Sequence, residues 1–345
     1  MKGSGFMAVI EVTPQTNISA LIASGDVNEG DVLLLEEGIY FQTVTIRKNN
    51  IRLVAKGSEV IFDGKATLFT AFSLLNVVGV VIEGIHIRHY RDDGIFIQAG
   101  SANRILNNRI NNMVDFAIDI IGSTANLIWK NHIQDCRSGI RLGSGSISNW
   151  IIDNTVRECF STAFSIFQAT AVNNAFISNK AIGSRGNGFT MIGSNNLLMD
   201  NLSIDNDQGV SVFDGSHSLA IGNRIQATRL NAFTVFNEYQ NYFAGENQLE
   251  CNGRIGINII GEFGIFLNNE SSYNADTGMT LASASRANLV KGNKLVCNIP
   301  QNMVDSGSDN NLIDNTDRPC EPCQSPEDIC GHCQDKERKC GRGSN

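Results

Sequence analysis

The stretch "DGIFIQAGSANRILNNRINN", residues 93–112, places alternating isoleucine and phenylalanine in front of a run rich in asparagine. An apolar residue at every second position is typical of a strand with one buried face. Asparagine is a poor strand former and a good turn former, so the stretch predicts a short strand followed by turns. Whether this is a single loop or a structural unit depends on whether the pattern recurs.

Two asparagines five residues apart recur along the chain with a step of 22 to 25 residues. The second of each pair, which is glycine at 84, stands at positions 84, 108, 131, 154, 179, 201, 223, 247, 269, 293 and 315. A fixed period in this range is the signature of a solenoid. Each period also holds two or three alternating apolar segments and lacks helical periodicity. The sequence therefore predicts short strands that stack in parallel, roughly 4.8 Å apart.

The repeated asparagines have a predicted structural role. Each coil must turn sharply at the same place, and asparagine tolerates the left-handed backbone conformation that such turns need. At one-coil spacing, its side-chain amide can also bond the next asparagine or its backbone. We therefore predict an asparagine ladder in which Asn131 and Asn154 are neighbours, with no catalytic role for either residue.

This repeat resembles that of the right-handed parallel β-helix, or pectin-lyase-like, superfamily over residues ~77–316. The preceding segment "ISALIASGDVNEGDVLLLEEGIYFQTVTIRKNNIRLVAKG" is similar to the start of that fold, with a short amphipathic capping helix, a turn and a first strand. The resemblance implies an all-β, single-stranded right-handed parallel β-helix of about eleven or twelve coils with a short N-terminal capping helix. We divide the chain into a cap with its first strand (1–45), the β-helix (46–316) and a cysteine-rich tail (317–345). The superfamily includes lyases, hydrolases, epimerases, adhesins and scaffolds, so the fold names no reaction.

Charge and hydropathy narrow the choice of partners. The 345 residues carry a formal net charge of −8 and no basic run, which argues against nucleic acid and anionic membranes. No apolar stretch reaches membrane-spanning length, and the N-terminus shows no continuous apolar segment of a signal peptide. We expect a protein made in the cytoplasm, with export to the extracellular medium, cell surface or spore surface by an unsigned route as the alternative.

Outward-facing residues of the alternating segments hold the first candidate site. The middle residue of each apolar triplet points away from the core, and so does the residue four positions earlier. In three consecutive coils these positions and their neighbours bring together Asp92, Asp93, Asp115, Asp119, Arg137 and Arg141. The alternative interpretation is a surface ladder of ion pairs between neighbouring strands, which would contribute little to stability.

This acidic patch resembles the calcium-binding cleft of pectate-lyase-like members of the superfamily. The resemblance implies that carboxylates hold Ca²⁺ against a uronate and that an arginine lies near the C5 proton of the sugar. The residues with implied catalytic roles are Asp115, Asp119, Arg137 and Arg141.

A second candidate patch lies in the turn that follows the same strands. Carboxylate, imidazole and phenol groups suit acid/base chemistry on a sugar, and exposed aromatic rings suit sugar stacking or a subunit interface. The candidate substrate-binding residues are Phe213, Asp214, His217, Phe236, Glu238, Tyr239 and Glu262. The alternatives are a longer turn that packs over the solenoid and a contact between copies in a homo-oligomer.

The nine cysteines fall into two groups. Cys136 and Cys159 occupy the same position of adjacent coils, where we prefer small buried core residues over a disulfide. Cys251 and Cys297 lie two coils apart, too far to bridge each other. The other five are in the tail.

Two C-x-x-C pairs in the tail offer four thiolates, the ligand count of a structural zinc site. The predicted zinc ligands are Cys320, Cys323, Cys330 and Cys333. The segment holds too few apolar residues to fold by burial, so order requires a metal or disulfides, and a disordered tail is the third alternative. We predict that the tail covers the open C-terminal end of the stack.

Two classes of function remain. One is a carbohydrate-directed protein that binds or processes a polysaccharide or oligosaccharide on the outer sheet face, as a lyase, hydrolase or epimerase. The other is a non-catalytic structural, coat or surface scaffold. The two acid/base patches favour the first class, and the lack of a signal peptide favours the second.

Overall fold

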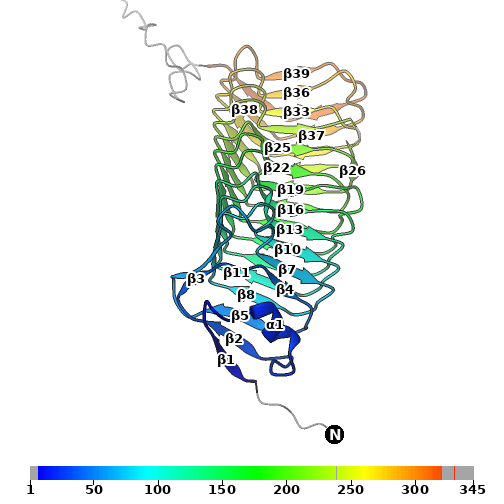
Figure 1. The fold of residues 1–345 in the computed structure, drawn as a ribbon. Coiled ribbons are helices and arrows are strands. Elements are labelled where there is room, and N and C mark those ends of the chain that lie inside the picture. The colour runs from blue at the N-terminus through cyan, green and yellow to red at the C-terminus, as the bar shows by residue number, and fades with distance from the viewer. Residues whose placement is uncertain (1–6, 238, 321–329, 331–345) are drawn as a thin grey trace, which may run out of the picture.

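The computed structural model describes residues 7–237, 239–320 and 330. The chain winds into a solenoid of three parallel sheets, with its N-terminal coils at the bottom of Figure 1 and its C-terminal coils at the top. The sheets hold 14, 13 and 12 strands, and we call them sheets A, B and C in that order. The predicted parallel β-helix is therefore confirmed, with about thirteen turns by the strand count of sheet B. The first coils carry no asparagine pair, and for that reason the repeat undercounts them.

Each coil contributes one strand to each sheet. The strands of sheet A are β1 (Val9–Val12), β2 (Val32–Leu35), β5 (Arg52–Ala55), β8 (Val81–Glu83), β11 (Arg104–Leu106), β14 (Leu127–Trp129), β17 (Trp150–Ile152), β20 (Ala175–Ile177), β23 (Leu197–Met199), β27 (Leu219–Ile221), β31 (Phe243–Gly245), β34 (Ile265–Leu267), β37 (Leu289–Lys291) and β40 (Asn311–Ile313). The strands of sheet B are β3 (Gly38–Tyr40), β6 (Val60–Asp63), β9 (His86–Arg88), β12 (Arg109–Asn111), β15 (His132–Gln134), β18 (Thr155–Arg157), β21 (Lys180–Ile182), β24 (Leu202–Ile204), β28 (Arg224–Gln226), β32 (Gln248–Glu250), β35 (Glu270–Ser272), β38 (Lys294–Val296) and β41 (Thr316–Arg318).

Sheet C holds the strands on which the first candidate site lies. They are β4 (Val44–Ile46), β7 (Phe72–Leu75), β10 (Ile95–Gln98), β13 (Phe116–Ile121), β16 (Ser138–Leu142), β19 (Phe164–Ile166), β22 (Asn187–Met191), β25 (Gln208–Val212), β29 (Phe233–Val235), β33 (Ile257–Ile259), β36 (Met279–Leu281) and β39 (Met303–Asp305). A two-stranded sheet of β26 (Gly215–Ser216) and β30 (Tyr239–Gln240) lies in the turns beyond it.

The predicted capping helix is present as α1 (Ile18–Ala23), at the N-terminal end of the stack beside β4 (Figure 1). The Asn17 side chain accepts a hydrogen bond from the N–H of Ala20 at 3.0 Å, which satisfies one of the free donors of the first turn. Ile18 and Ile22 are buried, so the apolar face of this short helix covers the first coils.

The core is a continuous column of apolar side chains, because one face of every strand points inward. Identical positions stack from coil to coil, as Ile95, Ile118 and Ile140 do in sheet C. Cys136 and Cys159 are fully buried free thiols, which confirms that they are core residues. Burial raises the pKa of the Cys136 thiol to about 12, so it is unreactive at neutral pH.

The predicted asparagine ladder is confirmed. Asn131 donates from Nδ2 to Asn154 Oδ1 at 3.0 Å, and its backbone N–H donates to the same oxygen at 2.9 Å. A further bond runs from Nδ2 of Asn131 to the carbonyl of Ile105 at 2.9 Å. One ladder comprises Asn108, Asn131, Asn154, Asn179, Asn201, Asn223, Asn247, Asn269, Asn293 and Asn315. A parallel ladder begins with Asn103, Asn126, Asn149, Asn174 and Asn196.

The left-handed backbone conformation belongs to a different residue from the one expected. The residue directly before each ladder asparagine has positive φ, as in Lys130 (φ 57°) and Asp153 (φ 52°), and the ladder asparagines themselves do not. The expectation that the asparagines adopt this conformation was therefore wrong. Their role is to pair buried backbone groups at the turn, which would otherwise lack partners.

A third ladder occupies the coil position at which Cys136 and Cys159 stand in earlier coils. Its rungs toward the C-terminus are Asn252, Asn274, Asn298 and Asn302. Each of the first three stands five residues after a rung of the longest ladder, as Cys136 stands five after Asn131. The same offset thus places a small apolar or amide-bearing residue inside the third turn.

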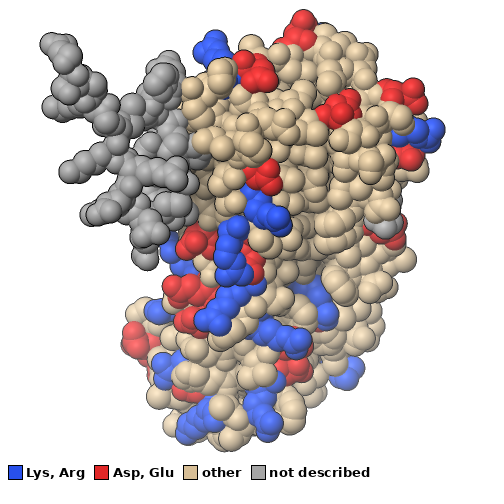
Figure 2. All heavy atoms as spheres, turned by 90° about the horizontal axis from the view of Figure 1, so that it is seen from above, with Lys and Arg blue, Asp and Glu red and all other residues tan. Residues whose placement is uncertain are grey.

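The surface mixes charges of opposite sign. In Figure 2, blue and red residues lie beside one another over part of the face, and a wide area carries neither colour. Pairs join neighbouring coils, as Lys294 Nζ does with Glu270 Oε1 at 2.7 Å. Exposed pairs of this kind contribute little to stability, so the fold depends on the core and the ladders.

We predict that Asn196→Ala lowers the free energy of unfolding by about 3 kcal/mol or more, because the backbone N–H and Nδ2 of Asn174 and the carbonyl of Ala171 lose their partners. The matched control is Asn195→Gly, which changes the neighbouring left-handed residue (φ 57°) and is expected to cost less than about 1 kcal/mol. Denaturant unfolding measures both. Equal losses in the two variants would contradict the ladder's role.

Candidate functional site

The outward row of sheet C brings Asp119 and Arg141 together. They are register partners of β13 and β16, as the alternation predicts. Arg141 donates from Nε to Asp119 Oδ1 at 2.8 Å and from Nη2 to Oδ2 at 2.6 Å. The Asp119 side chain is 3% exposed and that of Arg141 is 25% exposed, so the carboxylate lies beneath the guanidinium. A bidentate, largely buried pair is more than a surface ion pair.

The guanidinium of Arg141 also lies over the ring of Phe116, 3.9 Å from its centroid. The hydrogen bonds that Arg141 donates to the Asp119 carboxylate raise the pKa of Arg141 above its already high value. Arg141 is therefore a permanent cation, and it acts through its charge and its N–H groups and not as a proton acceptor.

Three carboxylates gather beside this pair. Each of Asp92, Asp93 and Asp115 offers an oxygen that lies within 4.8 Å of the other two. Asp93 is buried and accepts a hydrogen bond from the N–H of Phe116 at 3.1 Å. Asp115 lies 3.6 Å from Arg137 Nη1, which is the other predicted pair of the patch.

Crowding changes the protonation of this cluster. Burial, followed by repulsion from Asp119 and Asp92, raises the pKa of Asp93 to about 8. Burial also raises the pKa of Asp115, against the opposing effect of Arg137. At neutral pH the cluster therefore keeps one proton on Asp93, and a bound cation would compete with that proton.

The cluster fits a calcium ion by size. Oxygens no more than 4.8 Å apart lie at most about 2.8 Å from a common centre, close to the 2.3–2.6 Å of Ca²⁺–oxygen bonds. Small adjustments of the half-buried Asp92 and Asp115 side chains would close the difference. Asp92, Asp93 and Asp115, which all belong to the patch expected from the sequence, are therefore the residues that would hold the ion.

An open groove of about 620 Å³ runs from this patch along the outer face of sheet C. It is lined by Asp115, Phe116, Arg137, Ser138, Arg141, Ser161, Thr162, Ser165, Phe167, Asn187, Thr190, Ile192 and Phe213. Phe167 is 50% exposed, so one wall offers an aromatic ring and the floor offers hydroxyl groups. The sequence pattern missed Phe116, Ser138, Ser161 and Asn187, which stand at strand starts and in turns, where alternation does not give side-chain direction.

The second predicted patch is only partly assembled. Phe213 and Phe236 stack with centroids 4.3 Å apart, and Phe213 extends the groove. Tyr239 is fully buried, with its hydroxyl donating to the carbonyl of Gly193 and accepting from the N–H of Ser218, both at 3.1 Å. The prediction that Tyr239 binds substrate was therefore wrong, because its turn packs over the solenoid.

The remaining residues of that patch point to no shared chemistry. Glu262 pairs with Arg286 at 3.2 Å. Asp214 and His217 are exposed, and His217 Nδ1 lies 2.8 Å from the hydroxyl of Ser216. Glu238 lies outside the described residues.

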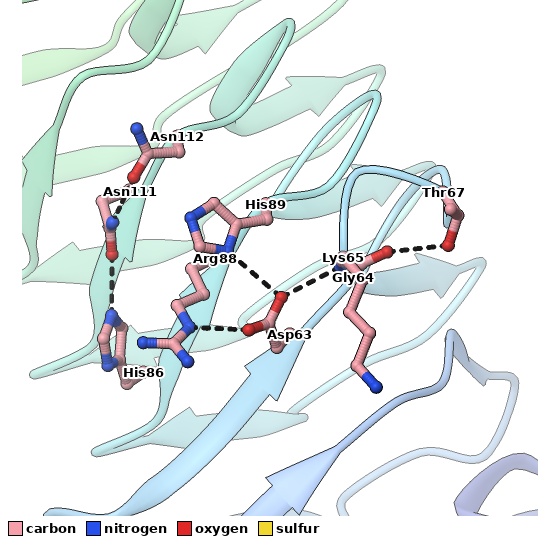
Figure 3. A network of polar contacts seen from close by, with 9 residues as sticks. All are labelled: Asp63, Gly64, Lys65, Thr67, His86, Arg88, His89, Asn111 and Asn112. Carbon is pink, nitrogen blue, oxygen red and sulfur yellow. Dashed lines mark hydrogen bonds and ion pairs between the residues drawn. The ribbon is translucent and has the colours of Figure 1, made fainter.

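A polar network on sheet B, which the sequence pattern did not indicate, surrounds Asp63 (Figure 3). The carboxylate accepts hydrogen bonds from Arg88 Nε and the backbone N–H of Lys65, both at 2.9 Å, and contacts His89 Nδ1 at 3.1 Å. Burial alone would raise the pKa of Asp63, but these partners together hold it below its ordinary value. The carboxylate is satisfied by the chain itself, so the network holds β6, β9 and the adjoining turn together.

Two tail cysteines pair with solenoid cysteines. Cys320 forms a disulfide with Cys297, and Cys330 forms one with Cys251, with Cα–Cα distances of 4.1 and 5.5 Å. Cys251 and Cys297 stand four residues after a ladder asparagine, in the left-handed position (φ 58° and 50°), one residue before the position that Cys136 and Cys159 occupy in their coils. That one-residue offset from Cys136 and Cys159 was the available signal.

These disulfides bear on two predictions about the tail. The sulfurs of Cys320 and Cys330 are engaged, and Cys323 and Cys333 lie outside the described residues, so zinc binding stays a prediction for the reduced chain. Cys330 joins a coil two turns before that of Cys297. Its sulfur is therefore fixed on the side of the solenoid and not over the open end.

The fold is a β-solenoid with an open groove on one sheet. The sequence model described as right handed beta helix region matches residues 32–181 and 148–295, and the chain belongs to this family. No protein of curated function matches the sequence significantly. Within the described residues, no helix has the length and apolar character needed to cross a bilayer.

Solved structures with the same fold carry names that describe different functions. The A-module of the Azotobacter vinelandii mannuronan C-5 epimerase AlgE6 superposes with a TM-score of 0.58 and 14% identity, covering 89% of this chain and 95% of that one. The catalytic domain of a GH87 α-1,3-glucanase gives 0.60 and 13%, covering 94% and 68%. The Streptococcus pneumoniae surface protein and adhesin PfbA gives 0.58 and 11%, covering 88% and 93%. At these identities the likeness establishes the fold alone.

We predict that Asp93→Asn raises the melting temperature by several degrees at pH 8 and hardly at all at pH 4, in buffer with chelator. The folded-state pKa is about 8, so wild-type stability falls as the pH rises from about 4 to 8, and asparagine removes this loss. Asp153→Asn, at an exposed position, is the control. An equal gain at both pH values would contradict the buried, protonated carboxyl.

We predict that peptide mapping finds the links Cys251–Cys330 and Cys297–Cys320, and that a dithiol reductant lowers the free energy of unfolding by about 3 kcal/mol or more. The double variant Cys251→Ser with Cys297→Ser should show the lower stability without reductant and no further change with it. Protein purified with free Cys251 and Cys297 and one bound zinc per chain would contradict these pairs.

Proposed function

We propose that the groove on sheet C binds a polysaccharide or oligosaccharide and that its acidic end processes the chain. The observation that carries this proposal is one continuous groove in which the exposed ring of Phe167 and the half-buried rings of Phe116 and Phe213 lie among hydroxyl, amide and guanidinium groups. Sugars present apolar C–H faces that stack on rings and hydroxyl groups that need hydrogen-bond partners. The fold is shared by proteins named as an epimerase, a glucanase and an adhesin, which is compatible with a carbohydrate ligand.

An acidic sugar suits the charged end of the groove. The two bonds to Asp119 use Nε and one Nη2 proton of Arg141, so further N–H groups of its five donors remain for a ligand carboxylate. Arg137 is 66% exposed and adds a second cation at the groove. A calcium ion on Asp92, Asp93 and Asp115 would supply further positive charge for a uronate.

Asp115 is the groove carboxyl best placed to exchange a proton. It lines the groove, its pKa is raised by burial, and Arg137 favours its ionised form. The spacing of the three carboxylates, 4.8 Å or less, is shorter than the roughly 6.5–9.5 Å of inverting glycosidases. Uronate lyase or epimerase chemistry therefore fits better than inverting hydrolysis.

A non-catalytic surface or coat scaffold is the second candidate function. The observation that favours it is that Asp119 and Arg141 already satisfy each other within the protein. In either case the two disulfides favour an oxidising compartment, and we propose that the protein works outside the cytoplasm.

The test is a panel of acidic and neutral polysaccharides, with and without Ca²⁺, assayed for binding by calorimetry, for unsaturated uronates and for released sugars. Phe167→Ala should weaken binding roughly two- to tenfold by loss of stacking. Phe41→Ala is the matched control, since both side chains are 50% exposed and Phe41 lies outside the groove.

Arg137→Ala is expected to reduce binding of acidic polymers while leaving neutral ones unchanged, because it removes an exposed cation. Binding without any product in all conditions would select the scaffold function. Failure of every polysaccharide to bind, or equal loss in the two phenylalanine variants, would refute the proposal.

A further inference from the structure

The outer face of sheet A lacks polar side chains over seven consecutive coils. Every residue of β14, β17, β20, β23, β27, β31 and β34 is Ala, Gly, Ile, Leu, Met, Phe or Trp. The middle residue of each strand points into the core, as Ile151 and Phe266 do, and both are fully buried. The first and third residues point outward, which leaves two apolar rows on the surface.

These rows are exposed to solvent. Trp129 is 36% exposed, Trp150 49%, Leu219 37% and Ile265 38%. The outward residues of the other two sheets at the same height are mainly polar, such as His132 and Thr155 on sheet B and Arg141 and Ser165 on sheet C, although Ile182, Leu202 and Ile204 on sheet B are apolar. Isolated exposed apolar residues are normal, whereas a continuous patch marks an interaction surface.

The size of the face matches a protein interface. Six inter-strand steps give a length of roughly 29 Å. Twelve outward side chains, with Gly245 and the buried Ala175 excluded, at roughly 40–50 Å² each offer on the order of 480–600 Å² of apolar surface. That is at the upper end of the largest patch that monomers leave exposed and approaches the ~800 Å² per partner of a standard interface.

The chain's own remaining segments do not suit this face. Residues 1–6 contribute only Met1 and Phe6 as large apolar side chains, and 321–345 contribute only Ile329. Cys330 is attached through Cys251, directly after β32 of sheet B. Neither segment has the apolar area to cover two rows of seven coils.

We infer that sheet A is a homo-oligomer interface, on which a second copy of the chain seats the same face. Two identical faces can pack against each other across a two-fold symmetry axis. Because the face carries no charges, this packing brings no like charges together at its centre. The rims choose the orientation. One rim carries Lys130, Asp153, Asp200 and Glu246, all exposed, and the other carries Ser148, Asn173, Asn195, His217 and Asn241.

With parallel solenoid axes, the mainly acidic rim of one copy faces the rim of the other that carries His217 and the three asparagines. With antiparallel axes the two acidic rims would face each other, which costs electrostatic free energy. The arrangement is thus two solenoids side by side, running in the same direction, with the grooves on both C sheets accessible.

The test measures mass by light scattering and analytical ultracentrifugation on the full chain. The wild type should have about twice the chain mass of 37.5 kDa. The double variant Trp150→Glu with Leu219→Glu should have half that mass. Its circular dichroism spectrum and melting temperature should equal those of the wild type diluted until it dissociates. Thr155→Glu with Arg224→Glu, on sheet B of the same two coils, is the matched control and should keep the wild-type mass.

Tryptophan fluorescence gives an independent measurement. The chain has two tryptophans, and Trp129 and Trp150 both lie on this face. Emission should shift to longer wavelength when the wild type dissociates on dilution. The inference would be overturned if the wild type had the mass of one chain at all concentrations, or if the interface variant kept the wild-type mass. Binding of a monomeric wild type to detergent or vesicles would also contradict it, because the apolar face would then have a different partner.

Discussion

The structure depends on one constraint, which is that every coil must pair its buried turn groups with those of the next coil. A turn inside a solenoid leaves backbone N–H and C=O groups away from water, and each unpaired group costs about 1–3 kcal/mol. The asparagine amide solves this at three turns, because it both accepts and donates along the stack. The ladders hold adjacent coils in register, and register in turn decides which side chains meet on the outside.

The candidate site is a direct consequence of that register. Asp119 and Arg141 are 22 residues apart in the chain, and they pair only because β13 and β16 are adjacent strands whose register places the two residues opposite each other. The same stacking forces Asp92, Asp93 and Asp115 together, where burial and mutual repulsion keep Asp93 protonated near neutral pH. A solenoid repeats positions and not residues, so among the described residues a cluster of this kind occurs once, where consecutive coils carry acidic residues.

The three sheets present three different surfaces. Sheet C offers a groove with hydroxyl groups and rings, sheet B is mainly polar and holds the disulfides at its turns, and sheet A is apolar from β14 to β34. Ligand binding, attachment of the tail and association of copies can therefore occupy separate faces without interfering. The oxidised tail adds covalent links at the C-terminal coils, the end that lacks a cap comparable to α1 among the described residues.

The sequence by itself determined the features that follow from the length of the repeat and from the alternation of side chains along each strand. The 22- to 25-residue step predicted the coils, alternation predicted the outward row through Asp119 and Arg141, and a shared position in adjacent coils predicted the buried Cys136 and Cys159. Only the tertiary structure decided the directions of the side chains in the turns, because the alternation that holds along a strand does not apply there. It buried Tyr239, moved the left-handed residue to the position before each ladder asparagine, and joined Cys251 to Cys330. It also decided the protonation of Asp93, because a pKa depends on the distance to other charges and on burial, which no periodic pattern specifies.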